Sequence, residues 1–243
     1  MRTIVFAKRC RKELLRDPLT LIFGLGFPLI LLLLLSAIQS NVPVPLFEIE
    51  RLTPGIAVFG LSFMTLFAAT LVAKDRESAF LQRLYTTPMT PVNFIGGYLL
   101  PLLPIALAQS ALCYLAAVAL GLPLSIHVVW AVLSMLPVSV FYVALGLLCG
   151  SVLTVKQVGG LCGALLTNLS AWLSGVWFDL ELVGKGFNKL AHLLPFVHMV
   201  ELERAILTDR LADTLPHLLP ILAYATLTAT AAVWLFLRQM KKQ

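Results

Sequence analysis

The sequence predicts an all-α polytopic membrane protein with six transmembrane helices. Composition, unbroken apolar runs and charge placement lead to that class. The chain has 243 residues, of which 59% are hydrophobic and 12% charged, whereas soluble domains carry roughly 25% charged residues. A soluble fold of this length could not bury so many apolar side chains. Composition therefore excludes a soluble protein and a disordered chain.

Stretches without Asp, Glu, Lys or Arg locate the predicted helices. Each can cross a hydrocarbon core of about 30 Å as a helix, and aliphatic runs such as 29–35 lack the alternation of transmembrane strands. The stretch 84–155 has 72 residues and suits two crossings, because Gly121 and Pro123 mark a turn inside it. The predicted spans are 19–40, 53–73, 95–120, 128–150, 157–178 and 214–237, within one transmembrane domain, 1–243.

The distribution of Lys and Arg predicts that both termini are cytoplasmic. Thirteen of the 18 basic residues fall in segments that would then be inside, and five fall outside, in agreement with the positive-inside rule. The loop 74–91 is then cytoplasmic, and the segment 179–213 is extracellular, with two short helices resting at the surface or dipping partway in. The net charge of +6 indicates topology rather than nucleic-acid binding.

The segment 1–17 is predicted to be an interfacial amphipathic helix. Phe6, Cys10 and Leu14 share one face at helical spacing, while basic residues lie on another. Such a helix is typical of segments that lie in the headgroup plane on anionic lipid. The alternative is that the basic residues only mark the inner side of the membrane.

The loop 74–91 combines dense charge with an apolar stripe. Its charges are concentrated at the start, the stripe follows at helical spacing, and Pro88 and Pro91 end the helix. This pattern predicts a short cytoplasmic helix whose apolar edge docks into a partner's groove; the alternative is an ordinary solvated loop. The candidate residues are Asp75, Arg76, Glu77, Phe80, Arg83 and Leu84.

Small and hydroxyl residues form a stripe on the predicted fifth span. At about 100° per residue its members fall within an arc of about 80°, and small residues let helices approach closely in lipid. The stripe could serve packing within one subunit, a subunit interface or the lining of a translocation path. Its members are Gly159, Gly163, Thr167, Ser170 and Ser174, and the second span carries a weaker set at Ser62 and Thr65.

Motifs for catalysis are absent from the sequence. No predicted span interior holds Asp, Glu, Lys or Arg, although proton-coupled carriers and intramembrane enzymes generally need an ionisable group at depth. Neither a nucleophile elbow nor a phosphate-binding loop occurs. His198 and Glu201 share a helical face but lack a third metal ligand nearby. We therefore expect no catalytic residue, no metal site and no ATP hydrolysis by this chain alone.

Three segments carry a resemblance to a known family: 11–18 with the apolar span that contains Pro28, then 74–88, then 194–204. Their order and spacing resemble the membrane-spanning permease subunit of a type-two ABC exporter, a family of bacterial drug, lipid and polysaccharide exporters. The segments would correspond to its interfacial helix with the first span, its coupling helix and its proline-to-arginine segment before the last span. The chain departs from the family at Ala79-Phe80, where Gly-Thr is common.

The resemblance implies a transport mechanism. Two permease subunits, identical or homologous, would pair in the cytoplasmic (inner) membrane, each with a separate ATP-binding subunit that holds ATP and Mg²⁺. Spans two and five would border the path of a small amphipathic, drug-like, lipid-like or glycan cargo. Phe80, Arg83 and Leu84 would sit in the ATPase groove, and Asp75, Arg76 and Glu77 would anchor the loop to the second span.

Two other classes of function stay open on the sequence alone. One is a six-helix channel or carrier that works without an ATPase, and the coupling-like loop 74–91 counts against it. The other is an intramembrane enzyme, and the charge-free spans count against it.

Overall fold

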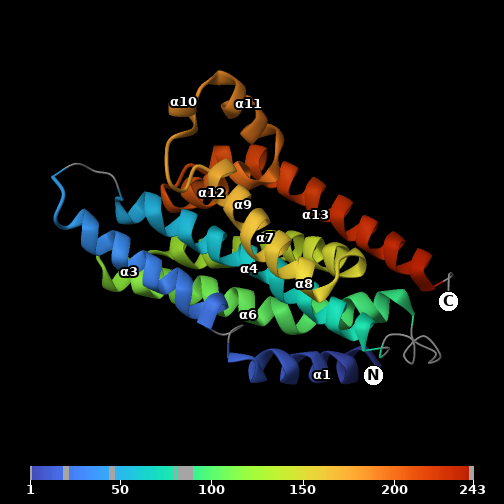
Figure 1. Ribbon diagram of the computed structural model, residues 1–243. Coiled ribbons are helices and arrows are strands. Elements are labelled where there is room, and N and C mark those ends of the chain that lie inside the picture. Colours follow the sequence, from blue (N-terminus) through green and yellow to red (C-terminus); the bar gives the residue numbers. More distant parts are fainter. Residues whose placement is uncertain (1, 19–21, 44–46, 79, 81–89, 241–243) are drawn as a thin grey trace.

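The computed structural model describes residues 2–18, 22–43, 47–78, 80 and 90–240, and these residues form helices and connecting loops without a β-strand (Figure 1). The all-α class is therefore confirmed. The elements are α1 Arg2–Arg16, η1 Ile22–Gly26, α3 Phe27–Gln39, α4 Ile49–Glu77, α6 Pro91–Ala119, α7 Ile126–Val152, α8 Val155–Val158, η2 Gly159–Leu166, α9 Thr167–Leu173, α10 Leu180–Val183, α11 Lys185–Leu193, α12 Pro195–Leu207 and α13 Leu211–Met240.

Five helices among the described residues are long and apolar enough to cross a membrane. The predicted fifth span is not among them. It is helical over 155–173 in three parts, of which the middle part, η2, is a π-helix, as is η1 at the start of the first span. A π-helix makes wider turns than an α-helix and is frequent at functional sites. The five long helices are Ile22–Gln39, Ile49–Glu77, Val92–Ala119, Ile126–Val152 and Leu211–Arg238.

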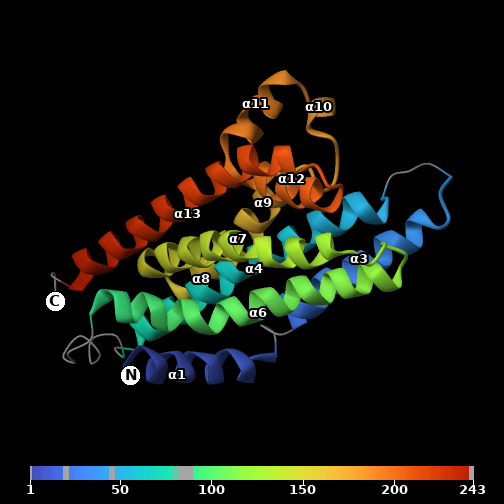
Figure 2. The ribbon, with the colours of Figure 1, turned by 180° about the vertical axis from the view of Figure 1, so that it is seen from behind.

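Helix α4 runs through the middle of the bundle, with α6 and α7 packed against it and α13 packed on α7 (Figures 1 and 2). Glycines allow the close approach. A Cβ on Gly146 would lie 2.5 Å from the Thr65 carbonyl oxygen, and one on Gly150 would lie 2.5 Å from the Ala69 carbonyl oxygen. Small residues at helix crossings let the two backbones come into van der Waals contact. The centre of the bundle is therefore closely packed around α4.

Helix α1 lies alongside α6 (Figures 1 and 2). Phe6, Cys10 and Leu14 are buried, so the amphipathic pattern correctly identifies the buried face. Phe6 packs so closely that a Cβ on Gly97 would lie 2.1 Å from its ring. The apolar face of α1 thus contacts the protein's own helix, while its contact with lipid headgroups stays a prediction.

The segment after α9 forms two parts at the end of the bundle opposite the last turn of α4. Helices α10 and α11 project away from the bundle, and α12 lies against α13 and α7 (Figure 1). Gly184, with φ of +121°, allows the turn between α10 and α11 because glycine adopts positive φ without strain. Nine of the 13 residues of α12 are buried, so α12 belongs to the packed interior.

Candidate functional site

The last turn of α4 directs a buried carboxylate at two other helices. Asp75 is 1% exposed, and both of its oxygens accept hydrogen bonds from the guanidinium of Arg9 on α1, each at 2.5 Å. The hydroxyl of Tyr98 on α6 donates a third bond of 2.8 Å. A paired, bidentate Arg–carboxylate contact is among the stronger polar contacts in proteins. Asp75 therefore holds α1, α4 and α6 together.

The next two residues bind other elements. The guanidinium of Arg76 donates bonds of 2.5 Å to the carbonyl oxygens of Ser151 and Leu153, where α7 ends and its last carbonyls need donors. Glu77 accepts a bond of 2.9 Å from the backbone N–H of Val155, in the first turn of α8. Each charge suits the helix end that it contacts. We call Asp75, Arg76 and Glu77, with their partners, the α4 clamp.

Phe80 lies on the α1 side of the α4 clamp. The guanidinium carbon of Arg9 is 4.3 Å from the centre of the Phe80 ring, a cation–π distance. The Phe6 ring stacks on the Phe80 ring with centres 6.4 Å apart. Phe80 is partly buried in the single subunit. The other two candidates of this loop, Arg83 and Leu84, lie outside the described residues.

Electrostatics at the clamp are set by burial and by its own ion pairs. Arg9 also contacts Glu13 at 2.9 Å, so its charge is shared between two carboxylates. The neighbouring Cys10 is fully buried, and burial raises the pKa of its thiol to about 12. A neutral buried thiol is a poor nucleophile. The charged contacts at the clamp therefore hold helices together beside a neutral buried thiol.

Polar side chains of spans two, four and five meet inside the subunit at Tyr142. The hydroxyl of Thr65 on α4 donates a 2.8 Å bond to the Tyr142 carbonyl oxygen, and the Tyr142 hydroxyl lies 2.6 Å from the Ser170 hydroxyl on α9. Ser62 is also fully buried and bonds the Phe59 carbonyl oxygen of its own helix. The structure thus brings the candidates of the second and fifth spans together.

The stripe on the fifth span has two environments. Thr167, Ser170 and Ser174 are buried within the subunit. A Cβ on Gly163 would lie 3.3 Å from Leu66, whereas one on Gly159 would meet nothing within 4 Å. The half of the stripe from Thr167 to Ser174 therefore packs internally in the single subunit, and the Gly159 end is open.

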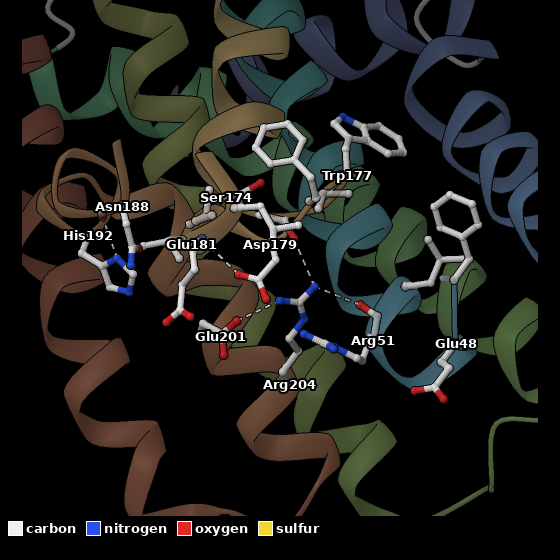
Figure 3. Close-up of a pocket in the computed structure, with 18 residues that line it drawn as sticks. Glu48, Arg51, Ser174, Trp177, Asp179, Glu181, Asn188, His192, Glu201 and Arg204 are labelled. Carbon is white, nitrogen blue, oxygen red and sulfur yellow. Dashed lines mark hydrogen bonds and ion pairs between the residues drawn. The ribbon is translucent and has the colours of Figure 1, made fainter. Parts of the chain in front are cut away.

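A cavity of about 510 Å³ lies between the start of α4, the segment 174–182 that leads into α10, and helices α11 and α12 (Figure 3). Arg204 holds it together, because its guanidinium bonds Glu201 at 2.8 Å and the carbonyl oxygens of Arg51 and Gly175 at 3.4 and 3.3 Å. Sequence reasoning identified the 194–204 segment but not this bracing role. Other lining residues include Phe47, Glu48, Trp177, Asp179, Glu181 and His192.

A second buried carboxyl, Glu203, went unnoticed in the sequence. It is fully buried on α12 and bonds Tyr114 of α6 and Ser134 of α7. The predicted spans were chosen as ranges without Asp, Glu, Lys or Arg, yet Asp75 and Glu203, which lie outside those ranges, are both buried. Among the described residues, no group of three or more His, Cys, Asp and Glu side chains could hold a metal ion.

Among the described residues, an all-helical bundle with five membrane-length helices indicates a polytopic membrane protein. The family described as "ABC-2 type transporter" matches residues 1–208. The chain therefore belongs to this family, which is the membrane component of ABC transporters, and the resemblance drawn from three segments is confirmed. The comparison with curated proteins finds no matching relative.

Proposed function

We propose that the chain is the transmembrane subunit of an ATP-driven exporter that moves a small amphipathic, drug-like, lipid-like or glycan substrate out of the cell. Its partners would be a separate cytoplasmic ATP-binding subunit, which holds ATP and Mg²⁺, and a second permease subunit, identical or homologous. The membrane would be the cytoplasmic (inner) membrane. Family membership supports the transport class, and the α4 clamp is the observation that carries the coupling role.

The clamp gives a physical route from a moving ATPase to the helices. A partner that binds 74–91 would apply its force at the end of α4. Asp75 passes that force to α1 and α6, and Arg76 passes it to the end of α7. Glu77 passes it to α8, at the start of the fifth span. Because charge-assisted hydrogen bonds are short and directional, these helix ends would move together.

Spans two and five would border the substrate path. Polar groups there include hydroxyls and carbonyls, as at Thr65, Tyr142 and Ser170, and these are hydrogen-bonded within the subunit in this arrangement. A path opened by movement of these helices would expose neutral hydrogen-bonding groups beside apolar ones. Such a lining suits an amphipathic cargo, and the free energy for transport would come from ATP on the partner.

The proposal is tested by co-expressing the permease with a candidate ATP-binding subunit, purifying the two together and reconstituting both in vesicles. We expect the two chains to co-purify, and we expect ATP hydrolysis to be required for cargo movement. The control is the same complex with an ATPase variant that binds ATP without hydrolysing it. Transport by the permease alone, at the rate of the complex, would support the channel or carrier alternative.

A further inference from the structure

Glu203 is a buried carboxyl for which the described part of the chain supplies no cation partner. It lies on α12 and is 0% exposed. Its Oε2 accepts a 2.8 Å hydrogen bond from the Tyr114 hydroxyl on α6, and its Oε1 contacts the Ser134 hydroxyl on α7. An ionised carboxylate in such surroundings loses its hydration and gains only two neutral donors. The arrangement therefore favours the uncharged form of the side chain.

The number of protons available for hydrogen bonds at Ser134 also supports the uncharged form of Glu203. The Ser134 hydroxyl has a single proton, and it lies 2.8 Å from the carbonyl oxygen of Ala131 on its own helix. If that proton goes to Ala131, the contact between Ser134 and Glu203 is favourable only when Glu203 itself donates. A protonated Glu203 completes a chain of hydrogen bonds, in which Tyr114 donates to Oε2 and Oε1–H donates to Ser134. An ionised Glu203 would compete with Ala131 for one proton.

The surroundings of Glu203 offer no compensating charge among the described residues. On α6, the facing groups are Tyr114 and its neighbour Cys113, whose sulfur accepts a bond from Gln109. Other titratable groups of α12, and of α4, α7, α11 and α13 packed on it, either have partners of their own or are exposed. The paired groups include Arg204 with Glu201, His198 with His217, His127 with Asp209, and the three charged residues of the α4 clamp with their partners. The exposed groups include Glu50, Arg51, Lys74, Lys185, Lys189, His192, Asp213 and Arg238.

We propose that Glu203 is held as a neutral carboxylic acid that fastens α12 to α6 and α7, and that loss of its proton loosens this attachment. The same helix carries Glu201 and Arg204, which line the outer cavity and brace it against the start of α4. Loosening α12 would therefore alter the cavity. Alkaline conditions on this side of the protein would act on the permease through one carboxyl.

The pH range follows from the direction of the shift. Burial raises the pKa of Glu203 to about 8, from an ordinary value of 4.5, although the bonds from Ser134 and Tyr114 lower it. The folded subunit thus keeps a proton that the unfolded chain has lost between these values. Stability associated with Glu203 is full below the unfolded pKa, and it falls as the pH rises through the folded pKa.

Infrared spectroscopy of the purified permease tests the protonation state directly. We expect the carbonyl band of a protonated carboxylic acid at pH 7, and its loss both in Glu203→Gln and on titration to high pH. Glu201→Gln is the matched control on the same helix and should keep the band. If the carboxylic-acid carbonyl band at pH 7 is the same in the wild type and in Glu203→Gln, Glu203 is not protonated and the proposal is overturned.

Thermal unfolding between pH 5 and 9 tests whether the protonated Glu203 fastens α12 to α6 and α7. The unfolding temperature of the wild type relative to Glu203→Gln should fall as the pH rises, because the Gln variant does not titrate. Tyr114→Phe should move the midpoint of that fall to higher pH, since it removes a donor to the ionised form. This variant is compared with the wild type if Glu203→Gln does not fold. A wild-type curve parallel to Glu203→Gln at every pH would contradict the proposal. These readouts need no ATPase, so their failure would leave the exporter function standing.

Discussion

At the scale of single residues, the polar contacts of Asp75 constrain the helix positions most strongly, because three donors bind one buried carboxylate. We expect Asp75→Ala to cost about 1–3 kcal/mol of stability, because Tyr98 loses its acceptor inside the protein. The substitution costs less at Arg9, because Arg9 keeps its ion pair with Glu13 and is partly exposed to solvent. Thermal unfolding of the purified permease measures the effect. Asp213→Ala, at an exposed pair, should stay close to the wild type.

A second residue-scale prediction concerns close helix approach. In Gly150→Ala the new methyl group would overlap the Ala69 carbonyl oxygen of α4, and overpacking costs about 1–3 kcal/mol or more. Gly160→Ala is the matched control, because a Cβ there meets nothing within 4 Å and alanine favours helix. The yield of folded protein after detergent extraction should fall for Gly150→Ala alone. Equal yields would mean that α4 and α7 are less closely packed than described.

At the scale of elements, variants of the fifth span distinguish packing within one subunit from an interface between subunits. Ser170→Leu breaks the contact with Tyr142 inside the subunit and should lower the folded yield. Gly159→Leu adds bulk at an open position, so it should leave folding intact and reduce the recovered dimer if this end lies at the subunit seam. The two variants are compared by size-exclusion chromatography. Normal behaviour of both would exclude the stripe from packing and from the seam.

Some elements were predictable from local pattern and others were not. The apolar face of α1 follows from helical spacing of Phe6, Cys10 and Leu14, and the five long helices follow from charge-free length. The π-helix η2 carries no residue signal, because its backbone differs from an α-helix only in hydrogen-bond spacing. Glu203 was hidden because 179–213 holds many charges, and burial of one of them depends on contacts with α6 and α7 far along the chain.

At the scale of the whole molecule, the predicted topology places the α4 clamp and α11 on opposite sides of the membrane. The start of α1 and the end of α13 lie at the same end of the bundle as the clamp (Figure 2), in agreement with termini on one side. We expect cysteines introduced by Ser78→Cys and Gly186→Cys, both at exposed positions, to react with an impermeant reagent from opposite sides. The background lacks the four native cysteines. Labelling of both from one side would contradict the predicted topology.

The central claim is that the end of α4 transmits the work of a partner ATPase to the helices. The most direct measurement is the amount of cargo moved per ATP hydrolysed by the reconstituted complex with wild-type permease, with Asp75→Asn and with Asp213→Asn. Asp75→Asn weakens the bond to Arg9, so ATP should still be hydrolysed while the cargo moved per ATP falls several-fold; Asp213→Asn should match the wild type. An unchanged ratio in Asp75→Asn would contradict the account.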